Sequence, residues 1–359
     1  MWSHWICDTI SGLKLMPVFP SSESWRRVMN GIGSGTHTFQ LRDAETALPR
    51  DVWRDLARTW ARTVVTCWDE VPVYAGPIQH VKYHRPTGVL TLSTVEVRAI
   101  LAKRMPFGVP GYVPNGASAV SGKSLRGVAR QVVRWGTFMN APEDDWYLPV
   151  VLPADEAGGE SRSWPHHEFA TVDDLLAEIQ DTDGGPDIDC RPRWSGAGRL
   201  EWELRLGSPA LSGSVFEWDL TAPEVNVFDF THSRDGSKQL TGAFALGAGS
   251  GADMIVGQAN NPGSPSGRIP NRDDKRSFKL LRTKPEADAR AAAEVKAFRE
   301  ESELDEFKLL ASEVLPGLLP GSQLRQWIED DWFMADGWRS QIVAGMSGDL
   351  SEQIGVELL

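Results

Sequence analysis

The sequence predicts a mixed, β-rich α+β fold in which two strand-rich regions flank a smaller segment that contains helices. Apolar residues alternate with polar or small ones at 71–75 and again at 90–94, on either side of a turn at 86–88, which is typical of a β-hairpin. Residues 200–206 alternate strictly between apolar and charged side chains, which predicts a half-buried strand. Residues 285–314 begin with a proline suited to a first turn and continue with an alanine-rich run, which predicts a long helix.

The first strand-rich region covers residues 1–104. From Val95 the apolar spacing becomes helical, so the hairpin is expected to lead into a helix that packs against the sheet. The elements expected before the hairpin are strands at 2–6 and 13–18, a helical turn at 24–29, a strand at 36–41 and an amphipathic helix at 49–62.

Residues 105–193 are expected to form a linker followed by a helical and loop insertion. Residues 121–124, Ser-Gly-Lys-Ser, match the end of a phosphate-binding P-loop, but the glycine required five residues before Gly122 is replaced by Ala117. We therefore interpret them as the cap of a helix. Thr171 and the apolar spacing after it predict a second, N-capped amphipathic helix.

The insertion also contains the one cluster of metal-ligand side chains in the sequence, at 164–168. His166 and His167 are adjacent, so they point apart on a regular element, and no third histidine lies nearby in the sequence. A polar loop is the favoured interpretation. No catalytic, cofactor-binding or metal-binding residue is assigned anywhere in the chain, and no cofactor is expected.

The second strand-rich region covers residues 194–359. Its expected elements are strands at 200–206, 215–220 and 225–230, a glycine-rich strand pair at 242–257, the helix at 285–314 and closing strands at 324–328, 338–344 and 354–358. Like residues 1–104, this region combines strands with one helix. The three-part division is therefore consistent with an internal duplication interrupted by an insertion.

Composition limits the function. A net charge of −12 over 359 residues argues against a protein that grips nucleic acid by its phosphates, although an acidic wall suits a conduit through which DNA slides. The sequence shows no secretory signal and no apolar run long enough to span a bilayer, so assembly in the cytoplasm is expected. The three cysteines are too few and scattered for a disulfide framework, and most of the 15 tryptophans are expected in the core.

One ordered series of motifs carries a resemblance. Trp25, Met29, Asn30 and Gly31 precede a Gly/Thr turn; a valine-rich strand, the tripeptide at 74–76 and a hairpin strand follow, and the helix ends at 101–104 as Leu-Ala-Lys-Arg. This order resembles the first barrel of the tail-tip, or baseplate, hub proteins of siphophages, the minor tail proteins of phages that infect actinobacteria. The end of the chain, a helix, a Pro-Gly turn and a closing meander, is similar to the end of those proteins.

The resemblance implies a non-enzymatic structural protein of the virion, located at the tail tip. It implies two related β-barrel hub domains, at 1–104 and 194–359, with the small α-containing insertion between them. Three chains would form a ring that joins the tail tube and distal tail protein to the tip or central fibre. The ring would also contact other minor tail proteins, and the tape-measure protein and then DNA would pass through its channel during genome ejection, without specific DNA binding or stable membrane insertion.

Two alternatives remain open. A carbohydrate-binding adhesin would use tryptophans as sugar platforms. A cell-wall hydrolase would need two carboxylates across a glycosidic bond, and Glu329, Asp330 and Asp331 lie beside Trp327 and Trp332. Because consecutive carboxylates cannot flank a substrate in that way, an exposed strand end is the favoured interpretation of this stretch.

Overall fold

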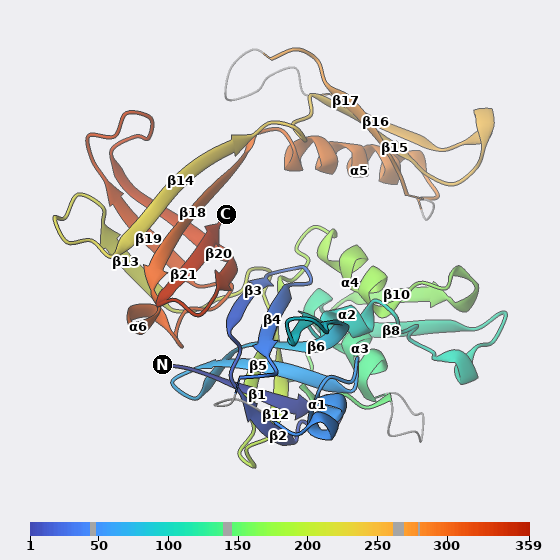
Figure 1. Ribbon diagram of the computed structural model, residues 1–359. Coiled ribbons are helices and arrows are strands. Elements are labelled where there is room, and N and C mark those ends of the chain that lie inside the picture. The colour runs from blue at the N-terminus through green and yellow to red at the C-terminus, as the bar shows by residue number, and fades with distance from the viewer. Residues whose placement is uncertain (44–47, 139–145, 261–268, 279–280) are drawn as a thin grey trace. The chain divides into compact units, whose positions relative to one another are not determined.

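The computed structural model describes residues 1–43, 48–138, 146–260, 269–278 and 281–359. The fold is β-rich with few helices (Figure 1). It divides into two compact units: the first combines Met1–Phe230 with Phe307–Leu358, and the second is Thr231–Glu306. None of the helices that the structure describes is both long and apolar enough to cross a membrane.

Most strands of residues 1–104 lie where the sequence pattern predicts them, but the helix expected at 49–62 ends at Leu56. The strands and helices are β1 (Trp2–Asp8), β2 (Lys14–Val18), β3 (Ser22–Val28), β4 (Ser34–Gln40), α1 (Arg50–Leu56), β5 (Arg62–Trp68), β6 (Val71–His84), β7 (Val89–Val95) and α2 (Arg98–Leu101). The predicted hairpin is confirmed in part: β6 and β7 pair in antiparallel register from Ile78 opposite Thr94 to His84 opposite Val89. The run at 71–75, expected as its first strand, pairs with β5 instead. The helix after the hairpin is a single turn.

The middle of the chain forms two small sheets packed with helices. The elements are η1 (Val109–Gly111), β8 (Ala117–Lys123), α3 (Leu125–Phe138), β9 (Val150–Val151), β10 (Glu160–Pro165), η3 (His166–Glu168), α4 (Val172–Gln180), β11 (Ile188–Trp194) and β12 (Leu200–Leu206). The predicted N-capped helix is confirmed as α4, where Thr171 and Asp174 form a capping box. The apolar faces of α3, α4 and β12 share one buried core.

The last elements of the first unit complete a large sheet. They are β13 (Val215–Asp219), β14 (Val227–Asp235), β18 (Ser302–Leu310), α6 (Ala311–Val314), β19 (Gln323–Ile328), β20 (Gly337–Gly348) and β21 (Gln353–Leu358), of which β14 and β18 also continue into the second unit. The sheet has 13 strands in the order β14-β18-β21-β20-β3-β4-β7-β6-β5-β1-β2, with β19 and then β13 branching from β20.

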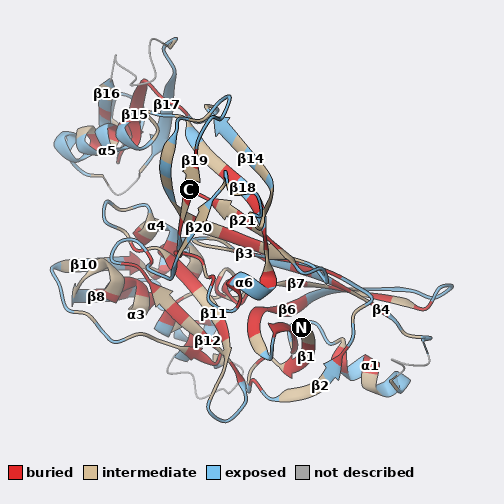
Figure 2. Ribbon diagram, turned by 90° about the vertical axis from the view of Figure 1, so that its left-hand side faces the viewer, coloured by how far each residue is buried: buried red, intermediate tan, exposed pale blue. Residues whose placement is uncertain are grey.

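The two ends of the chain are joined in this sheet through β3 and β20. These strands pair antiparallel, with Val28 opposite Gly345 and Trp25 opposite Gly348. Side chains from both regions, including Trp25, Tyr74 and Phe307, pack in a common core. Burial colouring shows the buried residues running along these strands (Figure 2). The first and last regions are therefore packed together, although more than 300 residues separate β3 from β20 in sequence.

The second unit is a small α/β layer. A three-stranded sheet of β16 (Val256–Asn260), β15 (Gly242–Leu246) and β17 (Asp273–Ser277) packs against α5 (Lys284–Ala297). The glycine-rich strand pair predicted at 242–257 is confirmed, since β15 and β16 are antiparallel. Gly257 allows the helix to approach closely, because an added Cβ would lie 2.0 Å from the backbone of Ala287.

Two local predictions are wrong. The helix expected at 285–314 ends at Ala297, and Ser302–Leu310 is strand β18, whose buried residues alternate over Asp305, Phe307 and Leu309. The helical turn expected at 24–29 is part of strand β3. In both places neighbouring strands supply hydrogen-bond partners from other parts of the chain, and this tertiary pairing overrides local propensity.

Candidate functional site

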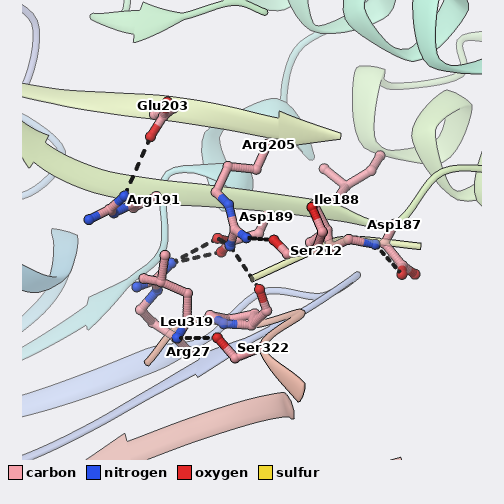
Figure 3. A network of polar contacts seen from close by, with 12 residues as sticks. Arg27, Asp187, Ile188, Asp189, Arg191, Glu203, Arg205, Ser212, Leu319 and Ser322 are labelled. Carbon is pink, nitrogen blue, oxygen red and sulfur yellow. Dashed lines mark hydrogen bonds and ion pairs between the residues drawn. The ribbon is translucent and has the colours of Figure 1, made fainter. Parts of the chain in front are cut away.

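A buried ionic junction holds together strands from distant parts of the first unit (Figure 3). Arg27 of β3 donates from Nη2 to both carboxylate oxygens of Asp189 on β11, at 2.8 and 3.0 Å, and from Nη1 to the carbonyl of Val73 at 3.1 Å. Arg205 of β12 donates to the same carboxylate at 2.9 Å and to the carbonyl of Pro320 at 2.8 Å. The junction therefore links the first region, the strands after the insertion, and the closing segment.

Arg27 is held in its charged form at this junction, and a second buried acid, Glu96, lies beside it. Burial would lower the pKa of Arg27, but Asp189 and Glu96 raise it. Glu96 lies 3.7 Å from Arg27 Nε and accepts a hydrogen bond from the Gly33 N–H at 2.6 Å. Burial raises the pKa of Glu96 to about 7, because it outweighs the attraction of Arg27. Glu96 therefore exchanges its proton near neutral pH.

A second polar cluster lies inside the N-terminal strands. Glu23 of β3 is buried between His4 of β1, at 2.5 Å, and His37 of β4, at 3.1 Å, and it accepts a hydrogen bond from Thr66 of β5. His37 in turn lies 3.3 Å from the hydroxyl of Thr94 on β7. These side chains come from strands that do not all pair with one another. They connect β1 to β3, although these two strands are not neighbours in the sheet.

The segment of 329–336, between β19 and β20, exposes large aromatic side chains. Trp332 is exposed over its whole surface and Phe333 over 68%. Asp331 accepts hydrogen bonds from the N–H groups of Phe333 and Met334, each at 2.8 Å, and Asp336 accepts one from the Asp330 N–H at 2.9 Å. This segment, called the acidic loop below, is thus shaped by its own carboxylates. The expectation that most tryptophans are buried is wrong, since five of the 15 are buried, seven are half-buried, and Trp60, Trp332 and Trp338 are exposed.

The three consecutive acids that the hydrolase alternative would use, Glu329, Asp330 and Asp331, all lie in the acidic loop. Asp331 shapes the acidic loop, and Glu329 accepts from the Trp327 indole N–H at 3.3 Å. They follow one another along a single exposed loop, as the favoured interpretation predicted. Among the residues described by the structure, no group of three or more His, Cys, Asp or Glu side chains is arranged to hold a metal ion.

An aromatic pocket opens on the insertion. It has a volume of about 450 Å³ and is lined by Phe107, Ala119, Arg134, Trp135, Phe138 and His166, with smaller residues between them. His166 stacks on Phe107 with ring centroids 4.1 Å apart and accepts a hydrogen bond from the Val113 N–H at 3.2 Å. The structure therefore places His166 in an aromatic stack, whereas the sequence predicted a polar loop. The pocket has no local signal in the sequence, because its walls come from η3, β8, α3 and the proline-rich linker.

The Ser-Gly-Lys-Ser stretch is a helix cap only at its last residue, Ser124, because residues 121–123 are the end of strand β8. Ser124 accepts a hydrogen bond from the Gly127 N–H at 3.1 Å at the start of α3, and Lys123 pairs with Asp155. The three cysteines are free, and burial raises the pKa of Cys7, Cys67 and Cys190 to about 12, which disfavours the reactive thiolate.

Comparison with known proteins identifies the fold. No protein-family model and no curated protein matches the sequence. Among solved structures, the 43 kDa tail protein of prophage MuSo2 from Shewanella oneidensis is similar over 99% of this chain and 98% of its own, with a TM-score of 0.61 and 11% identity. The tail protein from Neisseria meningitidis MC58 is similar over 99% of this chain and 96% of its own, with a TM-score of 0.58 and 14% identity.

The chain therefore has a fold found in phage and prophage tail proteins, and that likeness extends over nearly its whole length. The fold also occurs within the Francisella PdpA-VgrG complex, where the similarity covers 99% of this chain and 52% of the other, with a TM-score of 0.51 and 7% identity. At these identities the shared property is the fold.

Proposed function

We propose that the protein is a structural component of a phage virion, a hub at the tail tip. The observation that carries this proposal is the fold, which is shared over 99% of the chain with tail proteins of similar length. The buried polar side chains support a structural role, because the ionic junction and the Glu23 cluster connect strands and keep their charged groups enclosed. The proposal includes no enzymatic activity and no cofactor.

The finer form of the proposal is a homotrimer with two related β-barrel domains per chain, at 1–104 and 194–359, and an insertion at 105–193. Three such chains present six similar lateral surfaces, so that one ring can meet a sixfold tail tube on one side and a threefold tip on the other. The Glu23 cluster supports the first barrel, because side chains from β1, β3, β4, β5 and β7 meet in one interior.

The charge distribution supports a channel through the first unit. Residues 231–306 hold 12 basic and 12 acidic side chains, so the net charge of −12 belongs to the rest of the chain. A channel wall with this excess of carboxylates repels phosphates, and DNA then passes without being held. The proposed partners are the tail tube, the distal tail protein, the tape-measure protein and other minor tail proteins or a central fibre of a siphophage that infects actinobacteria. The virion would be assembled in the host cytoplasm.

The test measures the mass of the purified assembly and the position of the protein in intact tails. Light scattering and negative-stain class averages of the purified protein should give a ring of three chains with a central hole, and labelled antibody should bind one end of intact tails. A protein that is absent from tails, or that lies along the tube, would reject the hub. A cryo-EM map with a basic ring around the channel would reject the acidic lumen alone.

The exposed aromatic side chains of the acidic loop favour one second candidate, a tail-tip adhesin that binds host carbohydrate. Trp332 offers the flat apolar face that sugar rings stack on. The adhesin predicts that the isolated protein binds host cells and that Trp332→Ala abolishes this binding. A hub without adhesin activity predicts no binding by either protein.

A further inference from the structure

The acidic loop presents large aromatic side chains at the surface, above all Trp332. Trp332 and Phe333 are adjacent and largely exposed, and aromatic side chains of this size are the commonest anchors in protein interfaces. The loop backbone is held by Asp331 and Asp336, so the aromatic pair is presented on an ordered turn. Ordering before contact reduces the entropy that binding must overcome.

The aromatic pocket of the insertion has matching chemistry. Its volume of about 450 Å³ falls within the roughly 300–1,000 Å³ of pockets that enclose large ligands. Phe107, Trp135 and Phe138 provide apolar walls, and Arg134 lies among the lining residues. Of the three arginines of α3, Arg126 pairs with Glu156 and Arg130 donates to the Pro153 carbonyl, so Arg134 is the one that lines the pocket. An acidic loop with an aromatic tip complements such a pocket in both polarity and charge.

We propose that the acidic loop of one copy inserts Trp332 into the aromatic pocket of a second copy. The full exposure of Trp332 shows that it does not fill the pocket of its own chain. Loop and pocket are different surfaces of one chain, so the contact is heterologous, and each copy keeps one unused loop or pocket until a ring closes. The inference rests on the proposed hub, because it supplies the lateral contact between neighbouring chains of its ring.

Complementary variants test the contact directly. In the loop variant, Trp332→Ala with Phe333→Ala, the anchor is removed from an exposed turn. In the pocket variant, Ala119→Trp, an exposed lining residue of β8 fills the cavity. Tyr83→Ala, an exposed aromatic position on β6 outside both surfaces, is the control. Circular dichroism establishes that each protein is folded, and sedimentation velocity measures association over a range of concentrations.

The wild type and the control should associate, while each variant alone should remain monomeric, with association weakened about 30-fold or more. A mixture of the two variants should form a dimer of one copy of each and grow no further, because it contains one intact loop and one intact pocket per pair. Raising the salt concentration should weaken wild-type association, as expected for the acidic loop against Arg134.

Several results would overturn this contact. They are a wild type that stays monomeric, a loop variant that associates like the wild type, and a mixture of folded variants that stays monomeric. A threefold ring that persists in the loop variant would refute the contact and leave the proposed hub standing. Absence of the protein from tail tips would refute the hub, and the mixing result would still decide whether the contact exists.

Discussion

Arg27 and Asp189 form a buried ion pair across 162 residues of sequence, with two hydrogen bonds at 2.8 and 3.0 Å. Both side chains are almost completely enclosed. The carboxylate is also bound by Arg205, whose side chain is 13% exposed, so three side chains depend on one another at this junction. The pair fixes β3 against β11, and β3 in turn carries β20. The Arg27–Asp189 pair therefore helps to hold strands from the beginning and the end of the first unit together.

Replacement of Asp189 by asparagine should be strongly destabilising. The substitution keeps the shape but leaves two arginines facing a neutral group, and breaking a buried pair costs about 3 kcal/mol or more. Glu203→Gln is the control, because the Glu203 side chain is 34% exposed and lies 3.9 Å from Arg191 and 3.6 Å from Arg193, where each pair contributes about 0–1 kcal/mol. Urea unfolding measures both. Equal losses in the two variants would show that burial does not set the strength of the junction.

Glu23 should make the protein acid-sensitive. Burial by itself would raise its pKa, but the interactions with His37 and His4 lower the pKa to about 2 from 4.5. The stabilisation is therefore complete above pH 4.5 and is lost as pH falls from 4.5 towards 2, by roughly 3 kcal/mol. In Glu23→Gln this loss should disappear. The exposed Glu306→Gln should keep the wild-type pH profile, and a Glu23→Gln profile parallel to the wild type would contradict the prediction.

Glu96 should act in the opposite direction. Because its pKa is about 7 in the folded protein, against 4.5 for an exposed glutamate, folding favours the protonated form. Stability contributed by this group is present below pH 4.5 and declines as pH rises to 7, by roughly 3 kcal/mol. Glu96→Gln should therefore be more stable than the wild type at pH 8 and similar at pH 4. Chemical denaturation at the two pH values measures this difference, and a variant less stable at pH 8 would refute it.

Gly257 should be essential to the second unit. An alanine Cβ would lie 2.0 Å from the backbone of Ala287, so α5 has to move away from β16. Overpacking of this kind costs about 1–3 kcal/mol. Limited proteolysis should cut Gly257→Ala faster within 231–306, while the rest of the chain keeps its resistance. Gly196→Ala is the control, because nothing lies within 4 Å of the added carbon. Unchanged cleavage in Gly257→Ala would show that helix and sheet separate without cost.

Elements with a local signal could be predicted from the amino-acid sequence. The alternation at 200–206 became β12, the hairpin became β6 and β7, and the Thr171 cap became the start of α4. In each case the side-chain period or the cap lies within a few residues, so neighbouring positions carry the whole signal. The β-rich class followed from these elements.

Features that depend on distant partners became visible only in the folded chain. Strand β18 replaced the end of a predicted helix, because backbone groups from other strands were available to it. The pairing of β3 with β20, the Arg27–Asp189 junction and the aromatic pocket each combine segments separated by tens to hundreds of residues. The local pattern of a sequence does not specify which distant residues come into contact, because packing and burial determine those contacts when the chain folds.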